Sequence, residues 1–298
     1  MYCIDSIYRE GEYIHFINIP SDNVNAPILF MSHGFPDNAY GWDKQMEEFE
    51  GQYHIIAPFM HGTLNNNRVE NTRIKAKPLQ RDVLAVIEAA QYSPETEIIL
   101  IGHDLGCFLN NVIYNKLKKR VIGIVNLNGL PLAQYFERKL NITQWVKSYY
   151  VFLVQSFLGR YVVKKMMPNV LLNFIYNQSQ LDPSDDIRNN DSRVFRGIYI
   201  YQVLFFRIFS YFFKKIVKIK APTVFIWGNR DKFLNIPNRD EVEKFHTDAV
   251  VRVIEGGHWV LRSNSSHVNR ILDTTLIRWQ KNGPSTTSKA TLIGVKYE

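Results

Sequence analysis

Asp104 stands between two glycines at the end of an aliphatic run, a setting that could make its carboxylate a nucleophile. The run covers residues 98–101 and leads into Gly102-His103-Asp104-Leu105-Gly106, after which residues 110–120 have helix-compatible spacing. A strand, a sharp turn and a helix in this order lift the central side chain clear of the sheet edge. A carboxylate placed there can attack an electrophilic carbon and form an alkyl-enzyme ester. The competing interpretation is an ordinary strand end with a helix cap, where Asp and Gly are also common.

Three further loops carry small or polar residues at the ends of apolar runs. They are His33-Gly34-Phe35-Pro36, Trp227-Gly228-Asn229-Arg230-Asp231 and Gly256-Gly257-His258. In an open parallel sheet such loops share the carboxyl edge, where active sites form. We therefore expect Asp104, Asp231 and His258 to meet there as nucleophile, acid and base, in that chain order.

The elements that must position these loops read as a mostly parallel sheet flanked by helices, an α/β fold. Residues 131–219 break the alternation with aromatic, helix-length segments, so we interpret the middle of the chain as an insertion in one sheet domain. Residues 283–288 read as a linker, and the last ten residues as a loose tail. The predicted strands are 13–19, 27–31, 53–58, 98–101, 121–127, 220–227 and 250–254, and the predicted helices are 79–91, 110–120, 241–245 and 268–280.

Taken together, these features resemble the epoxide hydrolase and haloalkane dehalogenase branch of the α/β-hydrolase fold. The His-Gly-x-Pro turn, the aspartate at the sharp turn, the late acid and the late histidine match that family in type, order and spacing over residues 13–280. The resemblance implies that Asp104 is the nucleophile, that His258 activates water and that Asp231 supports the imidazole. It divides the chain into a hydrolase core at 1–129 and 219–282, a helical cap at 130–218 and a C-terminal tail at 283–298.

The resemblance also implies which groups stabilise charge and bind the substrate. The backbone N–H groups of Phe35 and Leu105 are the expected oxyanion donors. No cofactor and no metal are expected. The full expected oxyanion and substrate-binding set is His33, Gly34, Phe35, Pro36, Leu105 and Trp42.

Two tyrosines of the insertion are candidates for the pair that, in epoxide hydrolases, protonates the ring oxygen as the ring opens. Tyr150 precedes Gln155 by five positions, as the first tyrosine of the family does. Tyr201 is the candidate for the second, although its surroundings lack the usual Asn, aromatic, Tyr, Arg pattern and a neighbouring tyrosine is an alternative. General-acid help of this kind suits a poor leaving group, so the expected reaction is the opening of an epoxide to a diol. The competing interpretation is that both are core aromatics.

Two other functions remain open at this point. A haloalkane or haloacid dehalogenase would use the same three residues, but Leu105 stands where haloalkane enzymes, and many epoxide hydrolases, carry Trp, and Phe35 stands where haloalkane enzymes carry Asn. Leu105 and Phe108 also replace the arginines that clamp a haloacid, and an apolar pocket holds a carboxylate poorly. A non-catalytic ligand-binding protein is the third interpretation, because Phe59-Met60-His61-Gly62 departs from the Asp and Arg of relatives.

Composition narrows the partners and the compartment. The chain has 298 residues and a net charge of +8, but its basic residues are scattered and accompany no nucleic-acid motif, so we expect no nucleic-acid partner. Cys3 and Cys107 make no disulfide framework and the N-terminus shows no signal peptide, which favours the cytoplasm. Residues 194–217 are apolar but contain Arg196 and Arg207, so a lid helix, or a lid resting on a membrane surface, is expected rather than a span. The expected substrate is small and lipophilic, and the oligomeric state is open.

Overall fold

The computed structural model describes residues 2–60, 76–137, 142–147, 161, 177, 218–282 and 294–297. The described residues form one nine-stranded sheet with the strand order β1-β2-β4-β3-β5-β6-β7-β8-β9. Strands β3 to β9 run parallel, and only β1 and β2 run antiparallel to their neighbours. The predicted α/β-hydrolase architecture is confirmed. The strands are β1 (Ile4–Arg9), β2 (Glu12–Ile19), β3 (Ile28–Ser32), β4 (His54–Pro58), β5 (Ile98–His103), β6 (Val121–Leu127), β7 (Thr223–Gly228), β8 (Ala249–Ile254) and β9 (Gly294–Tyr297).

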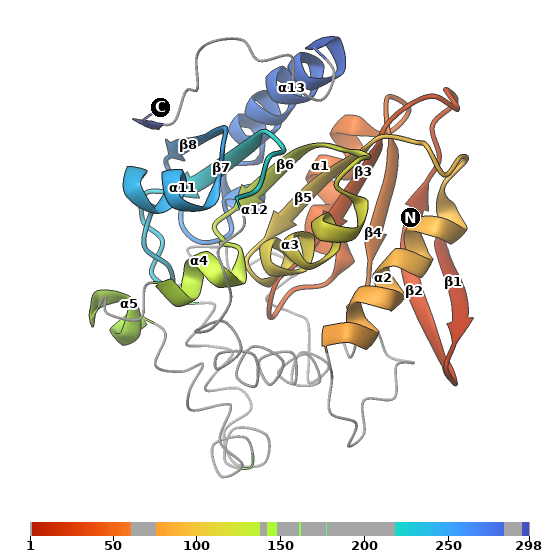
Figure 1. Ribbon diagram of the computed structural model, residues 1–298, viewed down its shortest axis with the longest axis horizontal. Helices are drawn as coiled ribbons and strands as arrows, with labels where there is room; N and C mark the ends of the chain where they lie inside the picture. Colours follow the sequence, from red (N-terminus) through yellow and green to blue (C-terminus); the bar gives the residue numbers. More distant parts are fainter. Residues whose placement is uncertain are drawn as a thin grey trace.

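Helices cover both faces of the sheet (Figure 1). Helix α3 packs between α2 and α4 on one face, and α1, α12 and α13 pack against one another on the other. Because both faces are covered, β3 to β7 are buried along their whole lengths, which explains their continuous apolar runs. The helices are η1 (Ala39–Trp42), α1 (Asp43–Phe49), α2 (Ala76–Ala90), α3 (Leu105–Leu117), α4 (Leu132–Glu137), α5 (Ile142–Lys147), α11 (Arg239–Phe245), α12 (Val260–Ser263) and α13 (Ser265–Asn282).

The differences from the sequence-based prediction lie mostly at the margins of the sheet. Strand β1 was not expected, because it is half exposed at the edge and mixes polar with apolar residues. Helix α1 was also missed, since only part of its short length is buried. Residues 294–297 form β9 beside β8, so the expectation of a loose tail is wrong for them. Edge elements carry a weaker hydrophobic signal than central strands because one side of them meets solvent.

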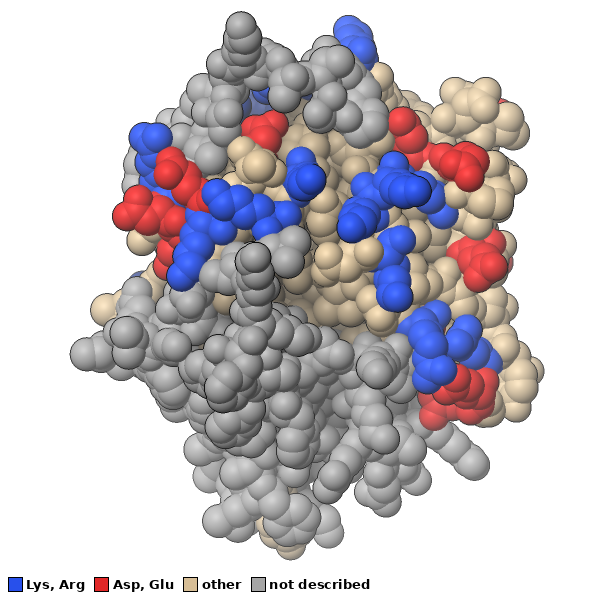
Figure 2. Space-filling view, in the orientation of Figure 1, with Lys and Arg blue, Asp and Glu red and all other residues tan. Residues whose placement is uncertain are grey.

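The predicted cap lies mostly outside the described residues, and its boundaries stay a prediction. Within it the structure describes α4 and α5, whereas Tyr150, Tyr201 and residues 194–217 lie outside the described part. No helix among the described residues is long and apolar enough to cross a membrane. In Figure 2, lysine and arginine side chains form several separate groups on the visible face, some of them beside acidic residues. This distribution matches the scattered basic residues of the sequence.

Candidate active site

Asp104 occupies a strained position between β5 and α3. Its backbone has φ 49° and ψ −116°, a combination that non-glycine residues rarely adopt. The turn is closed by a hydrogen bond from the Asp104 N–H to the Leu127 carbonyl, 3.1 Å away. A Cβ on Gly106 would overlap the carbonyl of Ser32, so that only glycine lets β3 and the start of α3 come this close. Strain of this kind persists only where the surroundings enforce it, and it concentrates at functional sites.

The backbone N–H groups of the two expected oxyanion donors, Phe35 and Leu105, point at the Asp104 carboxylate. The Phe35 N–H donates to Oδ2 of Asp104 at 3.0 Å, and the Leu105 N–H also hydrogen-bonds the carboxylate. Gly34 makes this approach feasible, because a Cβ there would lie 2.5 Å from the Cβ of Asp104. Pro36 follows through a cis peptide bond with Phe35. One oxygen of the candidate nucleophile therefore already sits at a hydrogen-bond donor from the neighbouring strand end.

His33 supports the donor loop, residues 33–36, through hydrogen bonds to the backbone. The two ring nitrogens bind backbone: Nδ1 donates to the Gly34 carbonyl at 2.8 Å, and Nε2 accepts from the Met60 N–H at 3.2 Å. This pairing, assigned from the partners, requires the neutral ring. Burial lowers the pKa of His33 to about 4, which fits the same neutral form. His33 is therefore a fixed structural support for the donor loop and not a proton carrier.

His258 and Asp231 form a buried pair at the ends of β8 and β7. Nδ1 of His258 lies 2.9 Å from Oδ2 of Asp231, and the imidazole is wedged between the rings of Phe233, His103 and Trp259. Burial opposes protonation of His258, but the charge and hydrogen bond of Asp231 outweigh it, so the pKa of His258 is raised. The pKa of Asp231 is lowered even though burial favours its neutral form, because His258 and several N–H donors stabilise the carboxylate.

Asp104 and His258 face each other without a direct hydrogen bond. Nε2 of His258 lies 3.8 Å from Oδ1 of Asp104, while the other ring nitrogen is engaged by Asp231. Burial raises the pKa of Asp104, although His258 and the N–H groups of Phe35 and Leu105 favour its ionised form. The three predicted residues thus come together at one sheet edge, with Nε2 free to take a proton from a molecule next to the Asp104 carboxyl group.

Asn128 belongs to this site and was not identified from the sequence. Its Nδ2 donates to Oδ2 of Asp231 at 2.7 Å, and its Oδ1 accepts from the Gly228 N–H at 3.3 Å. It too has a positive φ, 42°, directly after β6. The available signal was the Asn128-Gly129 dipeptide at the end of a buried strand, the same arrangement that marked the other site loops. Asn128 fixes the carboxylate from the side opposite the Phe233 and Leu234 N–H groups.

The remaining predicted binding residues have buried side chains. Phe35 and Leu105 are buried beside Asp104, and Trp42 is fully buried in η1 within the main hydrophobic cluster. A substrate-binding role for these side chains stays a prediction. Among the described residues, no group of three or more His, Cys, Asp or Glu side chains could hold a metal ion.

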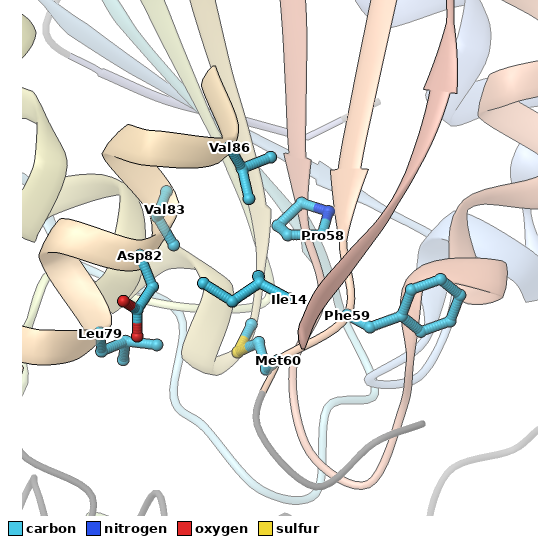
Figure 3. A pocket seen from close by; sticks show the side chains of 8 residues that line it. All are labelled: Ile14, Pro58, Phe59, Met60, Leu79, Asp82, Val83 and Val86. Carbon is cyan, nitrogen blue, oxygen red and sulfur yellow. The ribbon is translucent and has the colours of Figure 1, made fainter. Parts of the chain in front are cut away.

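A small cavity lies next to the donor loop but cannot hold a substrate. Figure 3 shows side chains of α2, including Asp82, facing the ends of β2 and β4. Its volume of about 10 Å³ is no more than a single water molecule needs, roughly 10–15 Å³. Asp82 is moreover engaged by Arg9, whose Nε lies 3.3 Å from its carboxylate. This cavity therefore belongs to the packing of α2 on the sheet.

Comparison with known proteins places the chain in a family. Residues 27–264 match the model of the alpha/beta hydrolase fold family. The chain is 24% identical to Epoxide hydrolase 3 of Xenopus tropicalis, over 87% of this chain and 74% of that protein. It is 23% identical to human Epoxide hydrolase 4, over 92% of this chain and 78% of that protein.

Solved structures agree with this fold. A Bacillus megaterium epoxide hydrolase in complex with an inhibitor superposes with a TM-score of 0.74 at 20% identity, covering 91% of this chain and 99% of that one. A putative acyltransferase from Salmonella enterica superposes with a TM-score of 0.80 at 15% identity, covering 93% and 95%. Structural likeness at such identities indicates the fold alone. The predicted resemblance is confirmed by the matching sequence model and by these relatives, and the chain belongs to the α/β-hydrolase fold family.

Proposed function

We propose that this protein opens an epoxide to a diol through an ester on Asp104, which water activated by His258 then hydrolyses. The observation that carries the proposal is the hydrogen bond from the Phe35 N–H to Oδ2 of Asp104 itself. In a serine hydrolase the corresponding N–H donors bind the carbonyl oxygen of the substrate. Here they hold an oxygen of the nucleophile, which is the atom that gains negative charge when water attacks an aspartyl ester.

The first step forms the ester. Oδ1 of Asp104 attacks a ring carbon, and the carbon–oxygen bond of the epoxide breaks in the same step. The released alkoxide is strongly basic and takes a proton from a general acid, the role that we assign to Tyr150 and Tyr201. The product of this step is a hydroxyalkyl ester of Asp104.

The second step removes the ester. His258 takes a proton from water through Nε2, and the hydroxide attacks the Asp104 carboxyl carbon. The Phe35 and Leu105 N–H groups stabilise the tetrahedral oxyanion. Collapse of this intermediate breaks the ester, and the proton on His258 passes to the leaving diol oxygen. The Asp104 carboxyl group then loses its proton, which returns through solvent to the tyrosine that was deprotonated in the first step, so that the carboxylate and the general acid are both restored. Asp231 keeps the proton-accepting tautomer of His258 and stabilises the imidazolium as it forms.

The names of the relatives support the substrate class. The amphibian and human proteins are called epoxide hydrolases. A small lipophilic epoxide suits the apolar side chains of Phe35, Leu105 and Phe233 around the pair of Asp104 and His258. Contact of the cap with a membrane surface would bring such substrates to the site.

Isotope labelling tests the covalent step. A single turnover with excess enzyme in water enriched in the heavy oxygen isotope should place that isotope in the peptide containing Asp104, because the attacking water oxygen stays partly in the carboxylate. Asp104→Ala, treated identically, sets the background. Label confined to the diol would mean direct attack of water on the epoxide and would overturn the mechanism. Halide release from haloalkanes without any epoxide turnover would replace the proposed substrate class.

A further inference from the structure

Helix α5 is hydrogen-bonded to the loop that carries Asp231. The described part of α5 comes from the predicted cap, yet its contacts are with residues 231–235, between β7 and α11 (Figure 1). Nε2 of Gln144 donates to the Phe233 carbonyl at 3.0 Å, and its Oε1 accepts from the Asn235 N–H at 3.0 Å. Nζ of Lys147 donates to the carbonyls of Asp231, at 3.0 Å, and Leu234, at 3.4 Å.

The same loop also binds the Asp231 carboxylate through its backbone N–H groups. The N–H groups of Phe233 and Leu234 donate to Oδ1 of Asp231 at 2.7 and 3.0 Å. Phe233 and Leu234 therefore each give an N–H to the acid and a carbonyl to α5. A donor on a peptide carbonyl polarises that peptide and strengthens the hydrogen bonds along the chain of groups. Gln144 acts in this way, because the Phe233 carbonyl that it binds and the Leu234 N–H belong to one peptide group. Lys147 binds the carbonyls of Asp231 and Leu234, which belong to other peptide groups, and its charged hydrogen bonds hold the loop in position.

We propose that Lys147 is a positioning residue for the acid–base pair: it fixes the Asp231 loop, and through it the orientation of the His258 imidazole, when α5 is docked. The proposal rests on the proposed function for its effect on turnover. Lys147 touches neither Asp104 nor His258 in any described contact, so it acts through the loop.

The charge of Lys147 adds a second, measurable effect. His258 faces the anionic groups of Asp231 and Asp104, the neutral ring of His103 and the ammonium of Lys147. The two carboxylates favour the imidazolium, whereas Lys147 lowers the pKa of His258. Loss of the ammonium should therefore raise this pKa. Because only neutral His258 accepts a proton from water, the rise of activity with pH should move to higher pH.

Lys147→Met removes the charge and the donor but keeps the length of the side chain. Burst kinetics on an epoxide should show ester formation little changed and ester hydrolysis slower by about 10-fold, a fraction of what acid–base catalysis contributes. The pH profile of hydrolysis should move to higher pH. Lys147→Arg should restore both. Lys232→Met is the matched control, since Lys232 is an exposed lysine of the same loop with its side chain in solvent, and it should leave both unchanged.

A substrate-free measurement separates this proposal from the proposed function. Titration of the His258 ring by nitrogen NMR should show a higher pKa in Lys147→Met than in the wild type and in Lys232→Met. An absence of epoxide turnover in the wild type would overturn the proposed function and leave this titration to decide the role of Lys147. An unchanged titration, with unchanged ester hydrolysis in an active enzyme, would overturn the role of Lys147 alone. Equal shifts in both lysine variants would show a general charge effect and likewise refute positioning.

Discussion

Asp104, which is partly exposed, and Asp231, which is buried, lie at the same sheet edge, but different parts of the molecule hold them. Asp104 is fixed by the sheet itself: it follows β5, and its hydrogen-bond donor Phe35 follows the adjacent strand β3. Asp231 is fixed by side chains and a loop, with Asn128 on one side and two loop N–H groups on the other. That loop is held in turn by α5, which lies in the predicted cap. The proposed nucleophile is therefore set by the sheet, whereas the proposed acid depends on contacts with α5.

Replacing His258 with Gln should separate ester formation from ester hydrolysis, and we expect the largest effect on turnover from this variant. Ester formation does not need His258 and should continue, while hydrolysis should fall by about 10⁴-fold or more, as for other triad histidines. The ester should accumulate, so that the intact mass rises by one substrate mass. Asp104→Ala under the same conditions should show no increase in mass. Normal turnover by the His258 variant would remove this residue from the mechanism.

Gly34→Ala tests the half that the sheet holds. The added methyl carbon would lie 2.5 Å from Cβ and 2.7 Å from Oδ2 of Asp104, so the carboxylate and the Phe35 N–H must separate. Loss of one such donor typically costs about 10²-fold or more in kcat. Ester formation itself should slow, in contrast to the His258 variant. Gly11→Ala strains the turn between β1 and β2, since Gly11 has φ +90°, but no heavy atom lies within 4 Å of the new Cβ and kcat should be kept. Urea unfolding checks that the Gly34 variant still folds, and a rate of ester formation equal to that of the wild type would contradict the prediction.

Tyr150→Phe and Tyr201→Phe test whether residues of the predicted cap take part in ester formation together with Asp104. Each variant loses only a hydroxyl, so the free energy of unfolding should hardly change. If these tyrosines protonate the ring oxygen, epoxide opening should slow by about 10²-fold, within the range for general-acid catalysis. The exposed Tyr13→Phe is the control. The measurement is the rate of ester formation on the best epoxide found. Full activity in both cap variants would show that they are core aromatics.

The smallest expected effect concerns stability and not turnover. Burial lowers the pKa of His246 to about 3, far below the ordinary value of about 6.5. The unfolded chain therefore binds a proton before the folded protein does, and the stability that neutral His246 contributes is present above about pH 6.5 and declines as the pH falls toward 3.

Stability also declines with falling pH because of His33 and His103, whose pKa values are about 4 and about 3. Each such group lowers the free energy of unfolding by up to about 1.4 kcal/mol per pH unit in this window. His246→Gln should make urea unfolding less dependent on pH by one such contribution, with activity at neutral pH preserved because His246 packs beside Phe225, away from the triad. An unchanged pH dependence would mean that His246 is already accessible to protons in the folded protein.

The sequence by itself determined the sheet, the strained turn and the three residues that meet at its edge. Central strands of a parallel sheet are buried on both faces, so they can be recognised in the sequence as continuous apolar runs. The loops after these strands share one edge of the sheet, whatever lies between them in the chain. Asp104, Asp231 and His258 could be identified for this reason, while β1, α1 and β9 could not, because their half-exposed sequences resemble loops.

Only the tertiary structure decided how the acid is supported. Asn128 follows β6, and Gln144 and Lys147 lie in α5. Both parts of the chain are distant in sequence from residues 231–235, and the types of these residues alone are common on any surface. Their roles arise from which peptide groups they reach. Likewise, the sequence shows a histidine at position 33, but the neutral state of His33 follows from its burial and from two backbone partners. Such roles depend on hydrogen-bond geometry over a few ångströms, which is set by packing between elements and not by local spacing.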